Sequence, residues 1–298
     1  MHADEADIDA ALVGRLIEDQ FPRWAGLPLE PVRSAGTDNA LFRLGPDMVV
    51  RLPRIPGAIE QVEKEHRWLP RLAPQLPIAI PVPLAKGRPG QGYAWEWSVY
   101  GWFEGDTATI ERIADRRQAA TDLGRFVAAL QGIDPMGGPP PGPHNSFRGE
   151  PLARRDPETR AAITALRGML DTDAATSAWE AALRAPAWKG QSVWLHGDLH
   201  AANMLAHRGR LSAVIDFGCL GVGDPACDLM PAWTYLSVDT RDPFRAALDV
   251  DDSTWARGRG WALSFGLIAL PYYQRTNPLL AGIARYAVDE VLADQEEG

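Results

Sequence analysis

Asp198, Asn203 and Asp216 lie close together in the sequence and could take part in one reaction. They belong to two short segments, WLHGDLHAANML at 194–205 and LSAVIDFG at 211–218. A carboxylate can orient a hydroxyl group and take up its proton. A second carboxylate and an amide oxygen are ligands that the hard Mg²⁺ ion prefers. These residue types therefore fit a site that activates a hydroxyl group and holds magnesium.

The spacing of these residues matches that of enzymes that transfer a phosphoryl group. Asp198 and Asn203 are five positions apart, as in the kinase catalytic loop H-R-D-x-x-x-x-N, and Asp216 begins a DFG triplet behind an apolar run. Phosphoryl transfer requires mainly that the hydroxyl be oriented and that metal be held on the phosphates. We expect His196 to brace the loop by hydrogen bonds rather than to exchange protons. A lone Asp in a loop is most often a turn residue. The prediction of phosphoryl transfer therefore rests on the occurrence of Asp198, Asn203 and Asp216 together, in this order and at this spacing.

Together with GDPACDL at 223–229, the motifs HGDLHAAN and IDFG resemble the aminoglycoside phosphotransferase family, whose members share the protein-kinase-like fold. The resemblance implies that Asp198 is the catalytic base and that Asn203 and Asp216 bind Mg²⁺. It implies ATP or GTP as the phosphoryl donor and Asp228 as an internal brace of the catalytic loop. The resemblance is highly specific at these C-terminal motifs. Over the rest of the chain it extends to nearly all residues but is less specific.

The same resemblance places a phosphate-binding loop between the first two strands, at 34–39 (SAGTDN). There Gly36 would let the backbone approach a phosphate, and Thr37 or Asn39 would donate to its oxygens. The chain has neither G-x-G-x-x-G nor G-x-x-x-x-G-K-[ST]. An ordinary hairpin turn therefore fits this loop as well as a phosphate loop does.

Arg51 stands on the expected third strand, where kinases commonly carry a lysine. Its guanidinium keeps the charge and can clamp phosphate in two places. We predict phosphate binding over the alternative of a side chain that only lies along the sheet. Its partner would be Glu65 or, as the second choice, Glu63, on a helix expected over 58–72.

The segment 97–105 (WSVYGWFEG) resembles the hinge between the two lobes of such enzymes. The resemblance implies that the backbone around Val99, Tyr100 and Trp102 reads the edge of the nucleotide base. Aromatic side chains in such a segment are more often core than base-stacking. We place the nucleotide-binding lobe at 1–101 and the catalytic and acceptor-binding lobe at 102–298.

The elements that must position these residues follow from hydrophobic periodicity. Alternating runs predict strands at 29–35, 40–44, 48–52 and 91–100, with helices at 8–21 and 58–72. Later stretches have helical spacing: 115–131, 154–170, 174–183, 225–236, 255–270 and 279–292. The predicted fold is α+β and bilobal, with a small antiparallel-sheet lobe of about five strands and a mainly helical lobe.

The composition places the chain among ordinary globular proteins. It has 298 residues, of which 46% are hydrophobic, and a net charge of −9. The electrostatic field of a net negative charge disfavours nucleic acid or an anionic membrane as a partner. Cys219 and Cys227 are too few for a disulfide scaffold and form no zinc motif. Without an apolar run of eighteen residues or a signal-peptide pattern, we expect a cytoplasmic protein, monomeric by default.

The acceptor is least determined by the sequence. In the family that the chain resembles, the acceptor lies between the catalytic loop and the late helices, and acidic residues commonly line the pockets for cationic aminoglycosides. We therefore expect a small hydroxyl-bearing acceptor that is cationic if it is an aminoglycoside. The acidic candidates, of which most are expected to be ordinary surface charges, are Asp224, Asp239, Asp242, Asp249–Asp252, Asp289 and Glu290.

Other segments of the second part admit two interpretations each. The Pro/Gly-rich stretch 134–144 is either a lid over the acceptor or a packed structural loop. Trp233 and Tyr235 could stack on a sugar, but core packing is the stronger expectation. We interpret His200 and His207 as loop or surface residues, because no third ligand at helical spacing supports a metal site.

Three functions remain open at this point. The first is an Mg²⁺-dependent kinase that modifies an aminoglycoside or another natural-product antibiotic and so confers resistance. The second is a metabolic small-molecule kinase for a sugar or amino alcohol. The third is a nucleotide-binding protein without catalysis, which Arg51 suggests and which the presence of Asp198, Asn203 and Asp216 disfavours.

Overall fold

The computed structural model describes residues 8–32 and 38–296. The chain divides into two compact units, one of Met1–Pro74 and Ala79–Glu104 and the other of Gln75–Ile78 and Gly105–Gly298. A sheet dominates the first unit and helices dominate the second, which confirms the predicted α+β fold. The functional division at residue 101 stays a prediction.

The first unit is built on a five-stranded antiparallel sheet with the order β1-β2-β3-β5-β4. Gly45, at φ +60°, lies in the short turn between β2 and β3. The strand predicted over 91–100 begins only at Trp97, because Gln91 and Gly92 have positive φ angles and form a turn. The elements of this unit are α1 (Ala10–Gln20), β1 (Leu29–Pro31), β2 (Asn39–Leu44), β3 (Met48–Pro53), α2 (Ile59–Leu72), β4 (Pro83–Gly87) and β5 (Trp97–Gly101).

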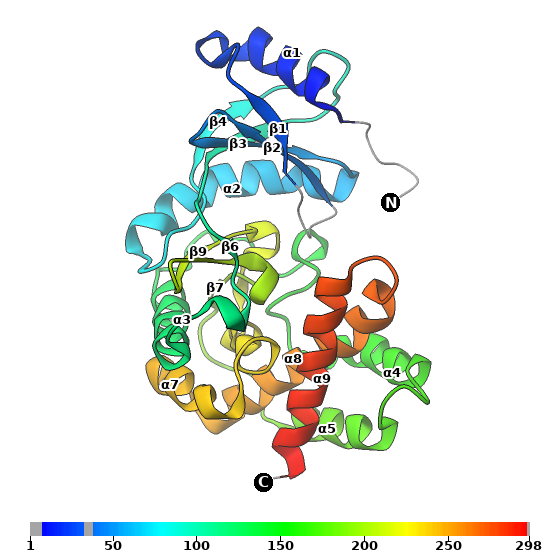
Figure 1. Ribbon diagram of the computed structural model, residues 1–298. Coiled ribbons are helices and arrows are strands. Elements are labelled where there is room, and N and C mark those ends of the chain that lie inside the picture. The colour runs from blue at the N-terminus through cyan, green and yellow to red at the C-terminus, as the bar shows by residue number, and fades with distance from the viewer. Residues whose placement is uncertain (1–7, 33–37, 297–298) are drawn as a thin grey trace. The chain divides into compact units, whose positions relative to one another are not determined.

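The two faces of this sheet carry different side chains, because successive residues of a strand point to opposite faces. One face provides apolar residues such as Phe42 and Val50, which form a buried cluster with Leu16 and its neighbours on α1. The opposite face carries Arg51 and Tyr100 toward α2, and Figure 1 shows α1 and α2 on opposite sides of the sheet. Two helices therefore cover the sheet, one on each face.

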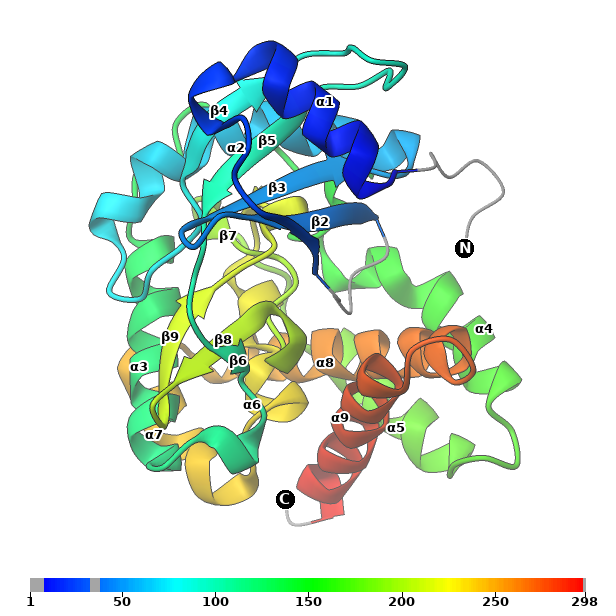
Figure 2. The same cartoon turned by 45° about the horizontal axis from the view of Figure 1, so that its top comes forward.

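The second unit combines short strands with seven α-helices among its described residues. Its strands form a three-stranded sheet of order β6-β8-β9 (Figure 2). A separate pair is formed by β7 and β10. The strands are β6 (Asp106–Thr107), β7 (Val193–Leu195), β8 (Met204–His207), β9 (Arg210–Val214) and β10 (Gly221–Gly223). The helices are α3 (Arg116–Gln131), α4 (Asp156–Ala165), α5 (Thr172–Arg184), α6 (Pro231–Thr234), α7 (Val238–Leu248), α8 (Asp252–Tyr273) and α9 (Pro278–Glu296).

Helix α8 is the central helix of this unit and is buried along most of its length. Asp251 caps its first turn by accepting the backbone N–H of Thr254 at 2.6 Å. A Cβ atom at Gly258 would lie 2.6 Å from Leu229 Cβ, and one at Gly266 would lie 2.7 Å from the Ala284 carbonyl oxygen of α9. These glycines allow close packing of neighbouring segments against α8.

The helix predicted over 225–236 is wrong in its form. Residues Pro225–Leu229 make a 3₁₀ turn, and a separate short helix, α6, starts at Pro231. Proline has no backbone N–H and its ring clashes with the preceding turn, so Pro231 begins a helix rather than continuing one. The next helix, α7, was not predicted at all.

Within residues 8–32 and 38–296, no helix has the length and apolar character needed to cross a membrane. The expected cytoplasmic location and monomeric state stay predictions.

Candidate active site

The loop that carries Asp198 runs from β7 to β8 and ends in a 3₁₀ turn, Ala201–Asn203. The antiparallel pairing of β7 with β10 places Leu195 opposite Gly221 and holds the start of the loop. The hairpin of β8 and β9 holds its end. Both anchors are backbone ladders, so the loop between them has fixed ends.

The β8–β9 hairpin places Asn203 next to the strand end that carries Asp216. Its two-residue turn is Arg208–Gly209, and both residues have positive φ angles, of 51° and 80°, as a type I′ turn requires. At the opposite end, the backbone N–H of Ile215 donates to the Asn203 carbonyl at 2.9 Å. Asn203 and Asp216 therefore lie at the same end of one hairpin.

Asp228 joins the loop to the segment that follows β10. Its carboxylate is fully buried and accepts the backbone N–H of His196 at 2.6 Å and that of Gly197 at 2.7 Å. Burial raises the pKa of Asp228, while His196 and the two backbone bonds act in the opposite direction. The carboxylate thus satisfies two backbone donors that would otherwise be buried without a partner.

The His196 ring is hydrogen-bonded at both of its nitrogens. Nε2 faces the carbonyl oxygen of Ile215 at 3.0 Å and must donate to it, so Nδ1 is the acceptor for the Asp198 N–H at 3.2 Å. The ring packs edge-on against Phe217, with 4.6 Å between centroids. With both nitrogens engaged and the side chain buried, His196 ties the Asp198 loop to the segment that leads to Asp216.

We predict that Gly197→Ala disrupts this loop. Gly197 has φ +84°, and an added Cβ would lie 2.6 Å from the Cys219 carbonyl oxygen. The left-handed conformation alone costs an L-residue about 1–2 kcal/mol, and the steric overlap adds to it. We expect a loss of unfolding free energy of about 2 kcal/mol or more, measured by denaturant titration, together with lower activity.

Gly282→Ala is the matched control for this substitution. Gly282 lies in α9 and has open space around its Cα, so alanine there should be neutral or stabilise by about 0.5–1 kcal/mol. Equal stability of the Gly197→Ala and wild-type proteins would show that the loop tolerates a side chain at this position.

The Asp198 carboxylate is held by three neighbours, with Oδ1 and Oδ2 bound separately. Arg148 Nη2 donates to Oδ1 at 3.3 Å. Asn203 Nδ2 donates to Oδ2 at 3.2 Å and to the Asp198 carbonyl at 2.9 Å, and His200 Nε2 lies 3.4 Å from Oδ2. Burial by itself would raise the pKa of Asp198, but His200, Arg148 and His196 together hold it well below its usual range. The carboxylate is therefore ionised and oriented.

Two of these three neighbours were not expected at the site. His200 lies in the loop between β7 and β8, as one of the two interpretations had it, but it is not a surface residue: it is 4% exposed and its ring stacks on Phe265 of α8 at 5.4 Å. Arg148 was not among the predicted site residues, yet it is buried beside Asp198. Only the position of His200, two residues after Asp198, was a usable sequence signal. For Arg148 there was none, because 50 residues separate it from its partner.

The Pro/Gly-rich stretch 134–144 is a packed loop. The Pro139 carbonyl accepts the backbone N–H of Val222 in β10 at 2.9 Å, and the Asp134 carbonyl accepts the indole N–H of Trp194 at 3.0 Å. A Cβ at Gly138 would lie 2.4 Å from Val222. These contacts favour a structural loop over a lid.

Most of the acidic acceptor candidates have partners within the second unit or lie on its surface. Asp224 is buried in an ion pair with Arg257, so it is not available to an acceptor. Glu290 pairs with Arg241, and Asp289 pairs with Arg285. The remaining candidates are exposed: Asp239, Asp242, Asp249, Asp251 and Asp252. Trp233 and Tyr235 are buried, as core packing requires.

The buried Asp224–Arg257 pair gives a second stability prediction. Nε and Nη2 of Arg257 donate to the two oxygens of Asp224 at 2.8 and 3.1 Å, and both side chains are less than 5% exposed. Arg257→Leu leaves a buried carboxylate without its counter-charge, which should lower the unfolding free energy by about 3–5 kcal/mol. Denaturant or thermal unfolding measures the loss.

The exposed pair Arg285–Asp289 is the control, because breaking a surface pair should cost less than about 1 kcal/mol. Adding Asp224→Asn to Arg257→Leu should recover part of the loss, since the isolated charge is then removed. Similar losses for Arg257→Leu and Arg285→Leu would contradict the argument.

In the first unit, Arg51 and Glu65 form an ion pair. Arg51 Nη1 donates to Glu65 Oε1 at 2.6 Å, and Nη2 donates to Gln61 at 3.1 Å. The Tyr100 hydroxyl donates to the other oxygen of Glu65, which is 1% exposed. With its amide oxygen turned toward Arg51, Asn39 accepts from Nε and Nη2 at 3.2 and 3.0 Å. Glu65 is thus the partner of Arg51 on α2.

Other residues predicted on the nucleotide side have different surroundings. Glu63 pairs with Lys86 at 2.7 Å. Val99 lies inside β5, between β3 and β4. The backbone N–H of Trp102 donates to the Asp47 carbonyl at 2.7 Å, so this N–H is not a free donor for a base. Gly36 and Thr37 lie outside the described residues. Base reading at this segment stays a prediction.

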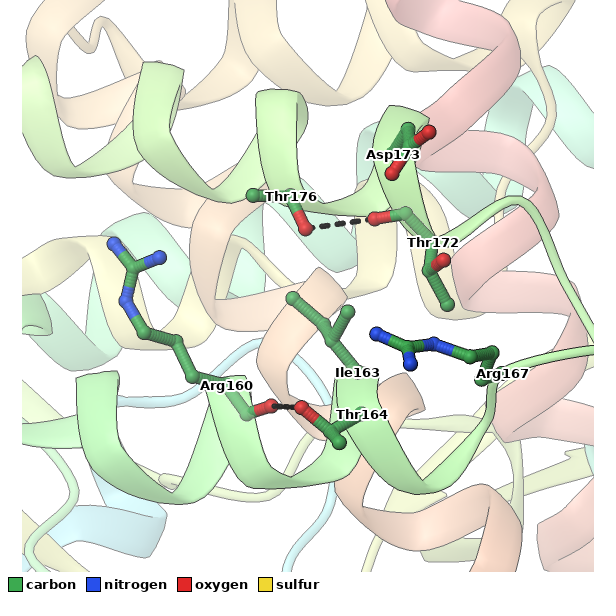
Figure 3. Close-up of a pocket in the computed structure, with 7 residues that line it drawn as sticks. All are labelled: Arg160, Ile163, Thr164, Arg167, Thr172, Asp173 and Thr176. Atoms are coloured by element: carbon green, nitrogen blue, oxygen red, sulfur yellow. Dashed lines mark hydrogen bonds between the residues drawn. The ribbon is translucent and has the colours of Figure 1, made fainter.

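A surface pocket of about 260 Å³ lies between α4 and α5 in the second unit (Figure 3). Two of its three threonine hydroxyls are already used: Thr176 donates to the Thr172 carbonyl, and Thr164 donates to the Arg160 carbonyl. With two arginines and one aspartate, this pocket lacks the acidic lining expected for a cationic acceptor. Its lining residues are Arg160, Ile163, Thr164, Arg167, Thr172, Asp173 and Thr176.

Asn203 and Asp216 have the chemistry to bind magnesium. Asn203 Nδ2 donates to the backbone carbonyl and to Oδ2 of Asp198. The amide oxygen of Asn203 is therefore the atom that could bind a metal ion. Asp216 has φ +61°, a strained conformation of a kind that clusters at functional sites. Among the residues that the structure describes, no group of three His, Cys, Asp or Glu side chains could hold a metal. Two oxygen ligands nevertheless suit Mg²⁺, which keeps several waters and phosphate oxygens in its shell.

Solved structures define the class of the fold. The GDP complex of an aminoglycoside 2'-phosphotransferase-IIIa mutant superimposes with a TM-score of 0.73 at 17% identity, over 97% of this chain and 99% of the other. The GDP and kanamycin complex of APH(2")-IIia gives 0.71 at 18% identity, over 95% and 98%. Macrolide 2'-phosphotransferase MphH from Brachybacterium faecium gives 0.60 at 25% identity, over 94% and 98%. The chain has the kinase-like fold of these antibiotic phosphotransferases.

The model of the APH phosphotransferase enzyme family matches residues 30–261, and the chain belongs to this family. The match covers the sheet of the first unit except Leu29, and every motif residue from His196 to Asp228. A search of curated protein sequences gives no match.

Proposed function

We propose that this protein transfers the γ-phosphoryl group of ATP or GTP to a hydroxyl group of an aminoglycoside or another natural-product antibiotic. One observation carries the proposal: the Asp198 carboxylate is bound through both oxygens, with Arg148 on Oδ1 and the Asn203 amide and His200 on Oδ2. A carboxylate held in this way can orient a hydroxyl group for in-line attack.

In the proposed reaction, the acceptor hydroxyl oxygen forms a bond to the γ-phosphorus as the bond to the bridging oxygen breaks. The hydroxyl proton passes to Asp198, and the nucleoside diphosphate leaves. His196 and Asp228 hold the loop. The separate contacts of Asp198 Oδ1 with Arg148 and of Oδ2 with Asn203 limit the rotation of that carboxylate. Mg²⁺, which Asn203 and Asp216 would hold, neutralises charge on the phosphates when bound.

The nucleotide side of the proposal rests on Arg51. Its pairing with Glu65 on the face of β3 that looks toward α2 corresponds to the lysine–glutamate pair that kinases need for phosphate binding. Among the structural neighbours are complexes with GDP, with ADP and with ATP. We therefore propose a purine nucleoside triphosphate as donor, with Arg51 on its phosphates.

A phosphorylation screen tests the function directly. Purified protein with Mg²⁺ and either ATP or GTP is offered aminoglycosides, macrolides and a panel of hydroxylated metabolites. The product is detected by mass spectrometry, and resistance of an expressing bacterial strain is measured in parallel. Transfer to an antibiotic supports the proposal; transfer to metabolites alone would identify a metabolic kinase, and nucleotide binding without any turnover would identify a non-catalytic protein.

A further inference from the structure

Arg148 is a buried cation whose only ion-pair partner among the described residues is Asp198. It is 8% exposed, and its Nη2 atom lies 3.3 Å from Asp198 Oδ1. Its Nε and Nη1 atoms have no hydrogen-bond partner in the described part of the chain. A buried guanidinium with two donors unused is unfavourable for folding, so its presence points to a purpose outside fold stability.

The backbone around Arg148 is shaped to point this side chain inward. Ser146 and Phe147 have φ angles of 52° and 58°, and Gly149 has 87°, so left-handed residues stand on both sides of Arg148. Such conformations are rare for residues other than glycine and cluster at functional sites. The Asn145 side chain locks the turn by accepting the Gly142 N–H at 3.0 Å and donating to the Arg148 carbonyl at 3.1 Å.

The same turn is bound to the end of β10 and to Asp224, which follows it. The Gly149 carbonyl accepts the Asp224 N–H at 2.9 Å, and a Cβ at Gly223 would lie 2.5 Å from the Gly149 carbonyl oxygen. The two backbones are thus in direct contact. The guanidinium also lies over the Trp261 ring, 5.6 Å from its centroid, which limits its movement from the α8 side.

We propose that Arg148 is a positioning residue for phosphoryl transfer: it holds Oδ1 of Asp198 so that the carboxylate keeps one orientation during the reaction. The inference rests on the proposed function. During the reaction the acceptor oxygen bonds to the γ-phosphorus, the bridging bond breaks and the hydroxyl proton moves to Asp198. Of the two carboxylate oxygens, Asn203 and His200 contact only Oδ2, so among the described residues Arg148 alone holds Oδ1.

The test uses the full chain with Arg148→Ala, Arg148→Lys and a matched control, Arg155→Ala. Arg155 is also buried and lies 5.5 Å from the Trp261 ring centroid, but it bonds to Ser264 and not to Asp198. For Arg148→Ala we expect kcat to fall by about 10²-fold with KM values within about twofold. Arg148→Lys should keep an intermediate kcat, and Arg155→Ala should keep the wild-type kcat per folded molecule.

Added methylguanidinium should restore part of the activity of Arg148→Ala and none of the activity of Asp198→Asn. A kcat equal to wild type in Arg148→Ala, or equal losses in the Arg148 and Arg155 variants without rescue, would overturn the proposal. If the wild-type protein consumes no nucleotide with any acceptor, the proposed function is refuted, and the positioning role of Arg148 must be tested without kinetics. Crystal structures of wild type and Arg148→Ala then decide the positioning role: a turned Asp198 carboxylate supports it, and an unchanged one refutes it.

Discussion

Asp198→Asn should lower kcat by about 10²–10⁴-fold while leaving the KM for nucleotide within a few fold. The substitution keeps the size of the side chain and removes its ability to take up a proton. It also replaces an oxygen that Arg148 or Asn203 contacts by an amide group that cannot accept from them. Steady-state kinetics with the acceptor found in the screen provides the measurement.

Two observations make the result of Asp198→Asn interpretable. Thermal unfolding and nucleotide titration should show that the variant folds and binds nucleotide, because the carboxylate lies in the second unit and Arg51 in the first. Full turnover in the variant would remove Asp198 from the reaction. Absence of turnover in both wild type and variant would favour a nucleotide-binding protein without catalysis.

Asp228→Asn should lower both stability and turnover, although Asp228 touches no reacting group. The asparagine amide offers one oxygen and one NH₂ group to two backbone donors, so one N–H of His196 or Gly197 loses its acceptor. An orphaned buried donor costs about 1–3 kcal/mol. Since burial already raises the pKa of Asp228, the loss arises from hydrogen-bond geometry rather than from loss of a favourable charge.

The catalytic effect of Asp228→Asn follows from displacement of the loop. A shift of the order of 1 Å in a reacting group can reduce kcat by about 10²-fold. Asp115→Asn is the control, because Asp115 also accepts a backbone N–H, that of Gln118 at the start of α3, and asparagine caps a helix equally well. Unchanged kcat and unfolding free energy in Asp228→Asn would contradict the bracing role.

The sequence alone predicted those features that depend on local spacing. Asn203 and Asp216 are joined by one hairpin, and the interval from Asp198 to Asn203 is contained in a single loop, so the motif nearly determines their arrangement. The α+β fold followed from alternating and helical periodicities. The preference for Glu65 over Glu63 as the partner of Arg51 also agrees with helical spacing, because Glu65 lies on the buried face of α2 with Val62 and Trp68.

The features that sequence reasoning missed depend on contacts between distant segments. The burial of Arg148 beside Asp198 is created by a turn packed against β10, and no periodicity in its own segment indicates that environment. Likewise His200 becomes buried only because α8 presents Phe265 to it. Helix α7 was missed because Pro243 interrupts its pattern, although the helix continues through that residue.

The separation of these contacts along the chain also orders the assembly of the site during folding. Asn203 and Ile215 meet across a hairpin with a two-residue turn, so the hairpin that holds both proposed magnesium ligands, Asn203 and Asp216, closes a short loop and can form early. His196 and Asp228 are 32 residues apart, and Arg148 and Asp198 are 50 apart, so these contacts close longer loops. The two proposed magnesium ligands should therefore come together before Asp198, the proposed base, is fixed. On the proposed function, a partly folded chain would hold metal before it could catalyse transfer.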